Sequence, residues 1–162
     1  MKEDPLPILL NTVSFEVNEI TVGLVLYILV VFVLIFLSAL ISGSEVSFFS
    51  LSSQNLEDLS EIDERKEKQI RKLLKNPNKL LATILIANNF INVAIIILSS
   101  FIISDIFNFK TGSSVQFVIQ VIVITFILVL LGEITPKVYA KKNAVSFSKK
   151  MTSVIIFFEW IF

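Results

Sequence analysis

The chain has 162 residues, of which 54% are hydrophobic and only 17% are charged, below the roughly 25% of charged residues found in soluble domains. Basic and acidic residues balance at 14 each, so the net charge of zero gives no reason to expect a nucleic-acid partner. Cys and His are absent, which excludes disulfides, thiolate and imidazole ligands and Cys- or His-based catalysis, and leaves oxygen atoms to hold any metal.

Three apolar segments are long enough to cross a membrane, whose core of roughly 30 Å takes about 20 helical residues. They span residues 20–43, 80–104 and 114–132. Residues 1–19 lack the basic start and the cleavage site of a secretory signal, and the first apolar run is too long for a signal core. We therefore predict an extracellular segment at 1–19 and a retained first membrane helix in an all-α membrane protein.

The basic residues predict the topology. Lys2 precedes the first span, and Lys110 lies between the second and third spans. The other basic residues fall in two groups, one between the first two spans (Arg65, Lys66, Lys68, Arg71, Lys72, Lys75 and Lys79) and one after the third (Lys137, Lys141, Lys142, Lys149 and Lys150). The positive-inside rule places both groups in the cytoplasm. We predict a multi-pass protein of the cell membrane with its N-terminus outside and its C-terminus cytoplasmic.

Two further regions are predicted to lie at the cytosolic surface. The connector 52–78 spaces apolar residues among charged ones as an amphipathic helix does, and we interpret it as a solvated connector that ends at the turn around Pro77. Residues 137–162 combine apolar residues with five lysines, which is typical of a juxtamembrane belt helix along an anionic leaflet. The final apolar run, 152–162, is too short to span a membrane, so we expect an interfacial position and a longer natural protein.

The first span ends in a cluster of small polar residues. Ser38, Ser42 and Glu45 share one helix face, and Ser44 belongs to a neighbouring stripe. Close helix packing alone could explain the serines and Gly43, because membrane helix interfaces are enriched in small residues. It does not explain Glu45, which needs water or a partner. A cytosolic helix end would give it water, so this cluster taken alone favours packing. Together with the other clusters, Ser42 and Ser44 are candidate ligands, and Glu45 is a candidate second carboxylate.

The second span carries three asparagines near its middle. Asn88 and Asn92 lie one turn apart on the same face, and Asn89 follows Asn88 directly. Asparagines can join membrane helices by hydrogen bonds of roughly 1 kcal/mol or less, but three within five residues exceed that need. Their neutral carbonyl oxygens suit Mg²⁺, Ca²⁺ or Na⁺, so a ligand role is favoured.

The third span ends in Gly132 and Glu133, shortly before Pro136. An ionisable residue inside a membrane segment marks an ion or proton site by default, although Glu133 could also have reached the headgroup layer. Pro136 clashes with the carbonyl of Gly132 one turn earlier, so the helix should kink or open there and leave carbonyl oxygens free. Pro136 and Gly43 are predicted flexible points.

These clusters together offer hydroxyl, amide, carbonyl and carboxylate oxygens. Mg²⁺ takes about six oxygens in near-octahedral geometry, and the clusters can supply most of them. A single carboxylate leaves a bound divalent ion with net positive charge, which would keep the ion weakly held and releasable.

The same motifs resemble those of a known family. Ser42-Gly43-Ser44-Glu45, the Asn88-Asn89 pair within 80–89, and the string from Gly132 to Lys137 are similar to the transmembrane domain of the CorC/cyclin M (CNNM) family, from about residue 20 to the end. Ala87 stands where the family pattern has Gly. The resemblance implies a homodimer of three membrane helices plus a belt helix in the lipid bilayer, and Mg²⁺ transport, mostly as efflux coupled to Na⁺.

The resemblance also implies specific residues and further domains. The family's ion site would fall on the serines of the Ser42–Ser44 region, on Asn88 or Asn89, and on the Gly132 carbonyl and Glu133. Cytosolic CBS domains that bind ATP–Mg²⁺ would follow beyond residue 162, so nucleotide binding is not assigned to these residues.

Two hypotheses follow from the sequence. The first is a divalent-cation transporter, a Na⁺-dependent Mg²⁺ exporter that binds the dehydrated ion between its helices, with Na⁺ as the coupling ion. The alternative is a non-transporting membrane anchor that tethers cytosolic sensor domains and whose bound cation is structural or regulatory. An enzyme is not expected, because no serine lies beside an evident general base.

Overall fold

The computed structural model describes residues 15–17, 21–109 and 113–161. Its helical segments are α2 (Val22–Phe49), α3 (Ser53–Leu74), α4 (Pro77–Ile106), α5 (Ser113–Ile127), the π-helix η1 (Leu128–Ile134), α6 (Thr135–Lys142) and α7 (Ala144–Ile161). Two short strands, β1 (Phe15–Val17) and β2 (Phe107–Phe109), pair antiparallel. Most of the predicted extracellular segment 1–19 lies outside the described residues.

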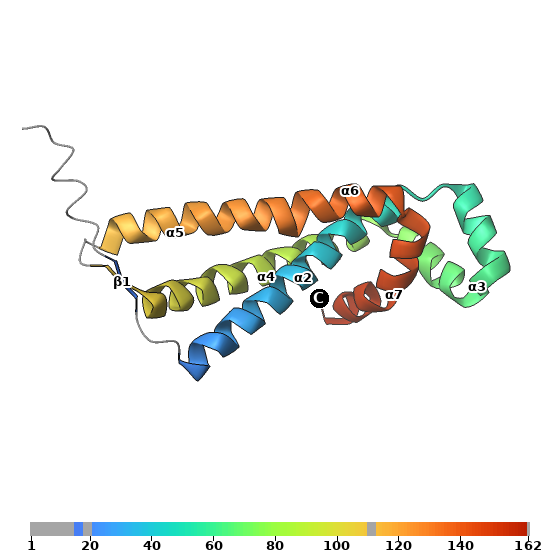
Figure 1. Cartoon of the computed structure of the whole chain (residues 1–162). Coiled ribbons are helices and arrows are strands. Elements are labelled where there is room, and N and C mark those ends of the chain that lie inside the picture. The colour runs from blue at the N-terminus through green and yellow to red at the C-terminus, as the bar shows by residue number, and fades with distance from the viewer. Residues whose placement is uncertain (1–14, 18–20, 110–112, 162) are drawn as a thin grey trace, which may run out of the picture.

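The long helices form an elongated bundle. Figure 1 shows α4 and the continuous rod of α5, η1 and α6 running along the molecule, with α2 crossing obliquely beside them. The strand ribbon lies at one end, and α3 and α7 gather at the other, which we call the basic end because it holds the lysines and arginines of α3, α6 and α7.

Three helices are apolar and long enough to cross a membrane, at Val22–Phe49, Pro77–Ile106 and Gln120–Lys142. They correspond to the predicted spans 20–43, 80–104 and 114–132, and the predicted class of all-α membrane protein is confirmed. Each observed helix extends further toward the basic end than its predicted span. The three-residue strands were not predicted.

Local signals explain where several helices begin. The Thr21 hydroxyl caps α2 by accepting from the Leu24 amide at 3.2 Å, and Ser52 forms a capping box with Asn55 at the start of α3. Pro77 is the first residue of α4, a position where its missing N–H is harmless.

Helix α3 is not the solvated connector that the sequence predicts. Its apolar stripe, which includes Leu59 and Ile70, is buried in the same core as Ile155 of α7. A bend at Asp63 lets α3 follow α7. The Asp63 carboxylate accepts from the Lys66 amide at 3.1 Å and pairs with Lys149 of α7 at 3.0 Å. The hydrogen bond from Lys149, followed by that from Lys66, lowers the pKa of Asp63.

The predicted juxtamembrane helix 137–162 is divided in two. Helix α6 continues the third membrane helix, and a turn at Asn143 starts α7 in a new direction (Figure 1). Buried Ser148, Met151, Thr152 and Ile155 all lie on α7. This amphipathic stretch therefore packs one face against the bundle, because its small and apolar residues recur at helical spacing.

Candidate cation site

Ser38 of α2 is the centre of a buried polar cluster between helices. Its side chain is fully buried, and its Oγ lies 3.0 Å from Asn88 Oδ1 and 2.8 Å from Asn92 Oδ1, both on α4. A serine hydroxyl has one proton to donate, so it can satisfy only one of these two oxygens at a time. Ser38 Oγ and the two amide oxygens therefore form a close group of three oxygen atoms, and hard cations bind oxygen atoms of this kind.

The third membrane helix brings a carboxylate to this cluster. Asn92 Nδ2 donates to Glu133 Oε1 at a long distance of 3.4 Å, and the Glu133 side chain is half-buried. Its neighbour Gly132 is buried, and a Cβ atom at that position would lie only 3.2 Å from Ser38 Oγ. The glycine therefore lets the backbone of η1 approach the Ser38 hydroxyl closely.

The helix is widened at this point rather than broken. Residues Leu128–Ile134 form a π-helix, and the amide N–H and the hydroxyl of Thr135 both donate to the Leu130 carbonyl, the hydroxyl at 2.8 Å. Pro136 offers no N–H to the preceding turn. The opening that the sequence predicts at Gly132 takes this form, and π-helical turns of this kind are frequent at functional sites.

The two candidate serines have different surroundings. Ser42, one turn after Ser38, is buried, and its Oγ has no hydrogen-bond partner within the described part of the chain. Ser44 is also buried, but its hydroxyl donates to the Leu40 carbonyl at 2.8 Å and is engaged within its own helix. An unpartnered buried hydroxyl is costly unless it gains a ligand, so Ser42 is the better placed of the two.

The remaining candidates have other surroundings. Asn89 is exposed. Glu45 forms an ion pair with Lys137 of α6 at 2.8 Å, and both side chains are partly exposed. Gly43 is a packing position, because a Cβ atom there would lie 2.7 Å from the Phe147 ring.

Ser38 is the residue that the sequence reasoning left out of the candidate ligands. Its place on the same face as Ser42 was visible from their spacing, but packing explained it equally well. Only the register between α2 and α4 singles it out, since that register sets Ser38 against both Asn88 and Asn92.

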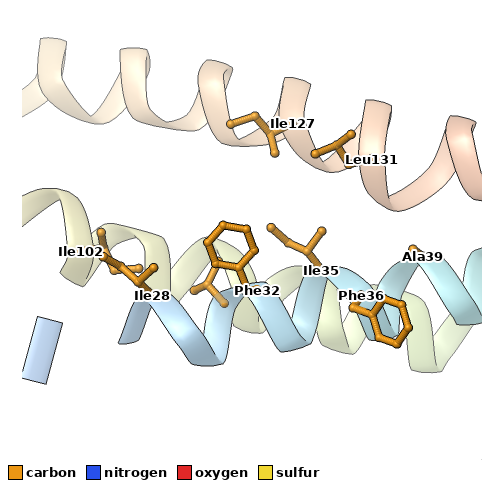
Figure 2. A pocket seen from close by; sticks show the side chains of 9 residues that line it. Ile28, Phe32, Ile35, Phe36, Ala39, Ile102, Ile127 and Leu131 are labelled. Carbon is orange, nitrogen blue, oxygen red and sulfur yellow. The ribbon is translucent and has the colours of Figure 1, made fainter. Parts of the chain in front are cut away.

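An apolar pocket of about 570 Å³ lies between the membrane helices beside the cluster. Figure 2 shows side chains of α2, including Phe32 and Ile35, facing Ile127 and Leu131 across it. Ala39 and Leu131, which line it, are the sequence neighbours of Ser38 and Gly132. The pocket lining offers no polar side chain, so the oxygen ligands are confined to the neighbouring cluster.

The chemistry of the cluster suits a hard cation. In the part of the chain that the structure describes, no group of three or more Asp, Glu, Cys or His side chains comes together. The cluster instead combines one carboxylate with neutral amide and hydroxyl oxygens, which are ligands of Mg²⁺, Ca²⁺ and similar ions.

The apolar helices and the oxygen-rich cluster between them define a multi-pass membrane protein with a candidate cation site. Residues 29–162 match the family model described as the Cyclin M transmembrane N-terminal domain. The chain therefore belongs to the cyclin M (CNNM) transmembrane domain family.

Similar proteins occur in bacteria and in an animal. The chain is 34% identical over 137 residues to a "UPF0053 protein" of Haemophilus influenzae and 28% identical over 104 residues to the "UPF0053 inner membrane protein YfjD" of Escherichia coli. It is 26% identical over 126 residues to "Metal transporter cnnm-4" of Caenorhabditis elegans. These alignments cover 82%, 64% and 75% of this chain but only 31%, 23% and 26% of the three relatives. The chain thus spans a third or less of their length.

Proposed function

We propose that the chain is the membrane domain of a divalent-cation transporter that exports Mg²⁺ in exchange for Na⁺. The family match supports transport by a membrane domain, and a relative of 26% identity is named a metal transporter. The choice of Mg²⁺ and of Na⁺ coupling rests on the family resemblance and on the hard oxygen ligands of the cluster.

The observation that carries the proposal is the contact of the Ser38 hydroxyl with both the Asn88 and the Asn92 oxygens, beside Gly132 and Glu133. With the amides oriented as in the structure, the Ser38 hydroxyl can donate to only one of the two oxygens at a time. A cation would satisfy all three oxygens at once, with Glu133 supplying the only negative charge of the cluster.

The surroundings of each candidate suggest which residues would bind the ion and which would contribute less. Ser38, Asn88, Asn92, Glu133 and the Gly132 carbonyl would hold the ion, and the unpartnered Ser42 hydroxyl would join them. Ser44 and Asn89 would contribute less, since one is engaged in its own helix and the other is exposed.

Release would depend on charge and on movement of the helices. One carboxylate leaves a bound Mg²⁺ with a net positive charge, because Glu45 is already paired with Lys137. Gly43 and Pro136 would serve as flexible points for alternating access. The transporter would act as a homodimer in the cell membrane with its N-terminus outside, and cytosolic CBS domains would follow in the full-length protein.

Mg²⁺ titration calorimetry on the detergent-purified chain tests the site. Glu133→Gln should weaken Mg²⁺ binding by about tenfold or more, because loss of a polar group at a metal site typically lowers metal affinity by about that factor. Glu45→Gln is the matched control, because it removes the same charge from a carboxylate that is paired with Lys137. Equal losses in both variants, or no binding by folded wild type, would count against the proposed site.

Reconstitution into liposomes separates transport from anchoring. Wild type should move Mg²⁺ across the membrane when a Na⁺ gradient is imposed, and Glu133→Gln should not. Saturable Mg²⁺ binding without any flux would favour the anchor hypothesis, in which the ion is structural or regulatory. Flux that is independent of Na⁺ would retain Mg²⁺ transport but overturn the coupling.

A further inference from the structure

A second pocket, of about 400 Å³, lies at the basic end of the molecule. The end of α2, the start of α3 and the turn between α6 and α7 enclose it, with side chains that include Ser50, Asn55, Lys141, Lys142 and Ser146. Its lining contains two lysines and several neutral polar groups but no carboxylate. The pocket is therefore positively charged and rich in hydrogen-bond donors.

The two lysines carry charge that nothing else in the described chain neutralises. The ion pairs among the described residues use Lys68, Arg71, Lys79, Lys137 and Lys149. Lys141 and Lys142 take part in none of them, and both side chains are exposed. Their charge is available to a ligand.

The start of α7 adds to this positive charge. The first N–H groups of a helix have no acceptor within the helix, and its N-terminus carries a partial positive charge. The side chain of Asn143, just before α7, bonds in the other direction, because its Nδ2 donates to the Tyr139 carbonyl at 3.3 Å. Ala144, Val145 and Ser146 of this first turn line the pocket.

The position of the pocket, at the end of a membrane-length helix, points to the depth of lipid headgroups. The third membrane-length helix ends at Lys142, and Tyr139, one turn from the pocket, is 59% exposed. Trp160 of α7 is 82% exposed. Exposed Tyr and Trp side chains gather at membrane–water interfaces, so the pocket opens where phosphodiester groups are present at high concentration.

We propose that this pocket is a binding site for the phosphate group of an anionic phospholipid. The Lys141 and Lys142 ammonium groups would form charge-assisted hydrogen bonds with the phosphate oxygens, and the amides at the start of α7 and the Ser146 hydroxyl would complete the cradle. The depth of the pocket favours a lipid over soluble phosphate. This proposal does not depend on cation transport, because no residue of the Ser38 cluster lines the pocket.

Native mass spectrometry of the detergent-purified chain tests it, with phosphatidylglycerol and phosphatidylcholine of the same acyl chains as probes. The double variant Lys141→Gln/Lys142→Gln should lose about tenfold or more in phosphatidylglycerol affinity, because it removes the charge-assisted hydrogen bonds to the phosphate. Lys72→Gln/Lys150→Gln is the charge-matched control, because both residues are exposed and lie outside the pocket. Its affinity should change by about twofold or less.

A second variant, Ser146→Glu, keeps both lysines but places a carboxylate in the pocket and should weaken phosphatidylglycerol binding in the same way. Equal losses in the pocket and control double variants would overturn the proposal in favour of diffuse charge attraction. Equal binding of the two lipids would also overturn it. Inorganic phosphate that displaces phosphatidylglycerol at millimolar concentration would overturn the choice of a lipid ligand.

Discussion

The two halves of α2 face different surroundings although they belong to one continuous helix. In the first half, Phe32 and Phe36 are 70% and 64% exposed. In the second half, Ile41, Ser42, Gly43 and the residues up to Phe48 are mostly buried. The first half therefore leaves large apolar side chains exposed on this chain, while the second half packs against other helices.

Residue size and polarity explain the difference. Small side chains let membrane helices approach closely, and polar groups at membrane depth need partners in other helices. Ser38 stands where the two halves meet, and it is there that α2 hydrogen-bonds to α4. The close packing of the second half therefore fixes the cation cluster, while the first half can tolerate change.

Replacement of buried and exposed phenylalanines should give the largest contrast between the halves. Phe48→Ala removes a fully buried ring and should lower the free energy of unfolding by about 3–5 kcal/mol. Phe32→Ala, at a site that is 70% exposed, should change it by about 0.5 kcal/mol or less. Thermal unfolding in detergent measures both, and similar losses would show that α2 packs uniformly along its length.

Glycine substitutions sharpen the same contrast at smaller scale. Gly43→Ala places a Cβ atom 2.7 Å from the Phe147 ring, so the ring must move, and overpacking of this kind costs about 1–3 kcal/mol. Gly23→Ala meets only an ordinary contact at 3.8 Å from Thr21 and should be neutral or slightly stabilising, by up to about 1 kcal/mol. Thermal unfolding of both variants measures these changes.

The glycine prediction has its own rescue test. If the Phe147 ring causes the loss, the double variant Gly43→Ala/Phe147→Ala should lose less stability than the sum of the two single variants. Strict additivity would instead indicate that Gly43 matters for the α2 backbone rather than for its contact with Phe147.

Serine substitutions distinguish structural hydroxyls from ligands. Ser38→Ala removes the donor shared by Asn88 and Asn92 and should lower stability by about 1 kcal/mol, the scale of a hydrogen bond between membrane helices. Ser42→Ala removes a hydroxyl without a partner in the described chain and should leave stability unchanged or raise it slightly, because the buried hydroxyl is costly. Both should weaken Mg²⁺ binding in the calorimetric titration. Unchanged affinity in Ser42→Ala would remove that serine from the ligand set.

The sequence predicted the membrane spans well because apolar length is a local property. It could also place Asn88 and Asn92 on one face, and it could locate a disturbed helix at Gly132 from Pro136, because helix geometry and proline chemistry act within a turn or two. The strands β1 and β2 were not predicted, because a strand of three residues is too short to show an alternating pattern of apolar and polar residues.

Contacts between helices could not be predicted in the same way. The pairing of Ser38 with both asparagines depends on the register of α2 against α4, and the pairing of Glu45 with Lys137 depends on where α6 meets α2. The amphipathic pattern of α3 showed that it has an apolar face but not that α7 covers it. Spacing along one helix predicts which residues share a face, but it does not predict which residues of another helix that face contacts.

The smallest expected effect concerns the ion pair that joins α3 to α7. Asp63→Asn keeps a side-chain oxygen that can accept from the Lys66 amide but removes the charge that pairs with Lys149. Because the pKa of Asp63 is lowered in the folded protein, the ion pair stabilises the fold above the unfolded pKa of about 3.9 and loses this effect as the pH falls through the folded pKa. Wild type should therefore unfold at a slightly higher temperature than Asp63→Asn at neutral pH, and the difference should vanish in strong acid. A difference that persists after protonation would assign the role of Asp63 to the shape of the bend in α3 rather than to its charge.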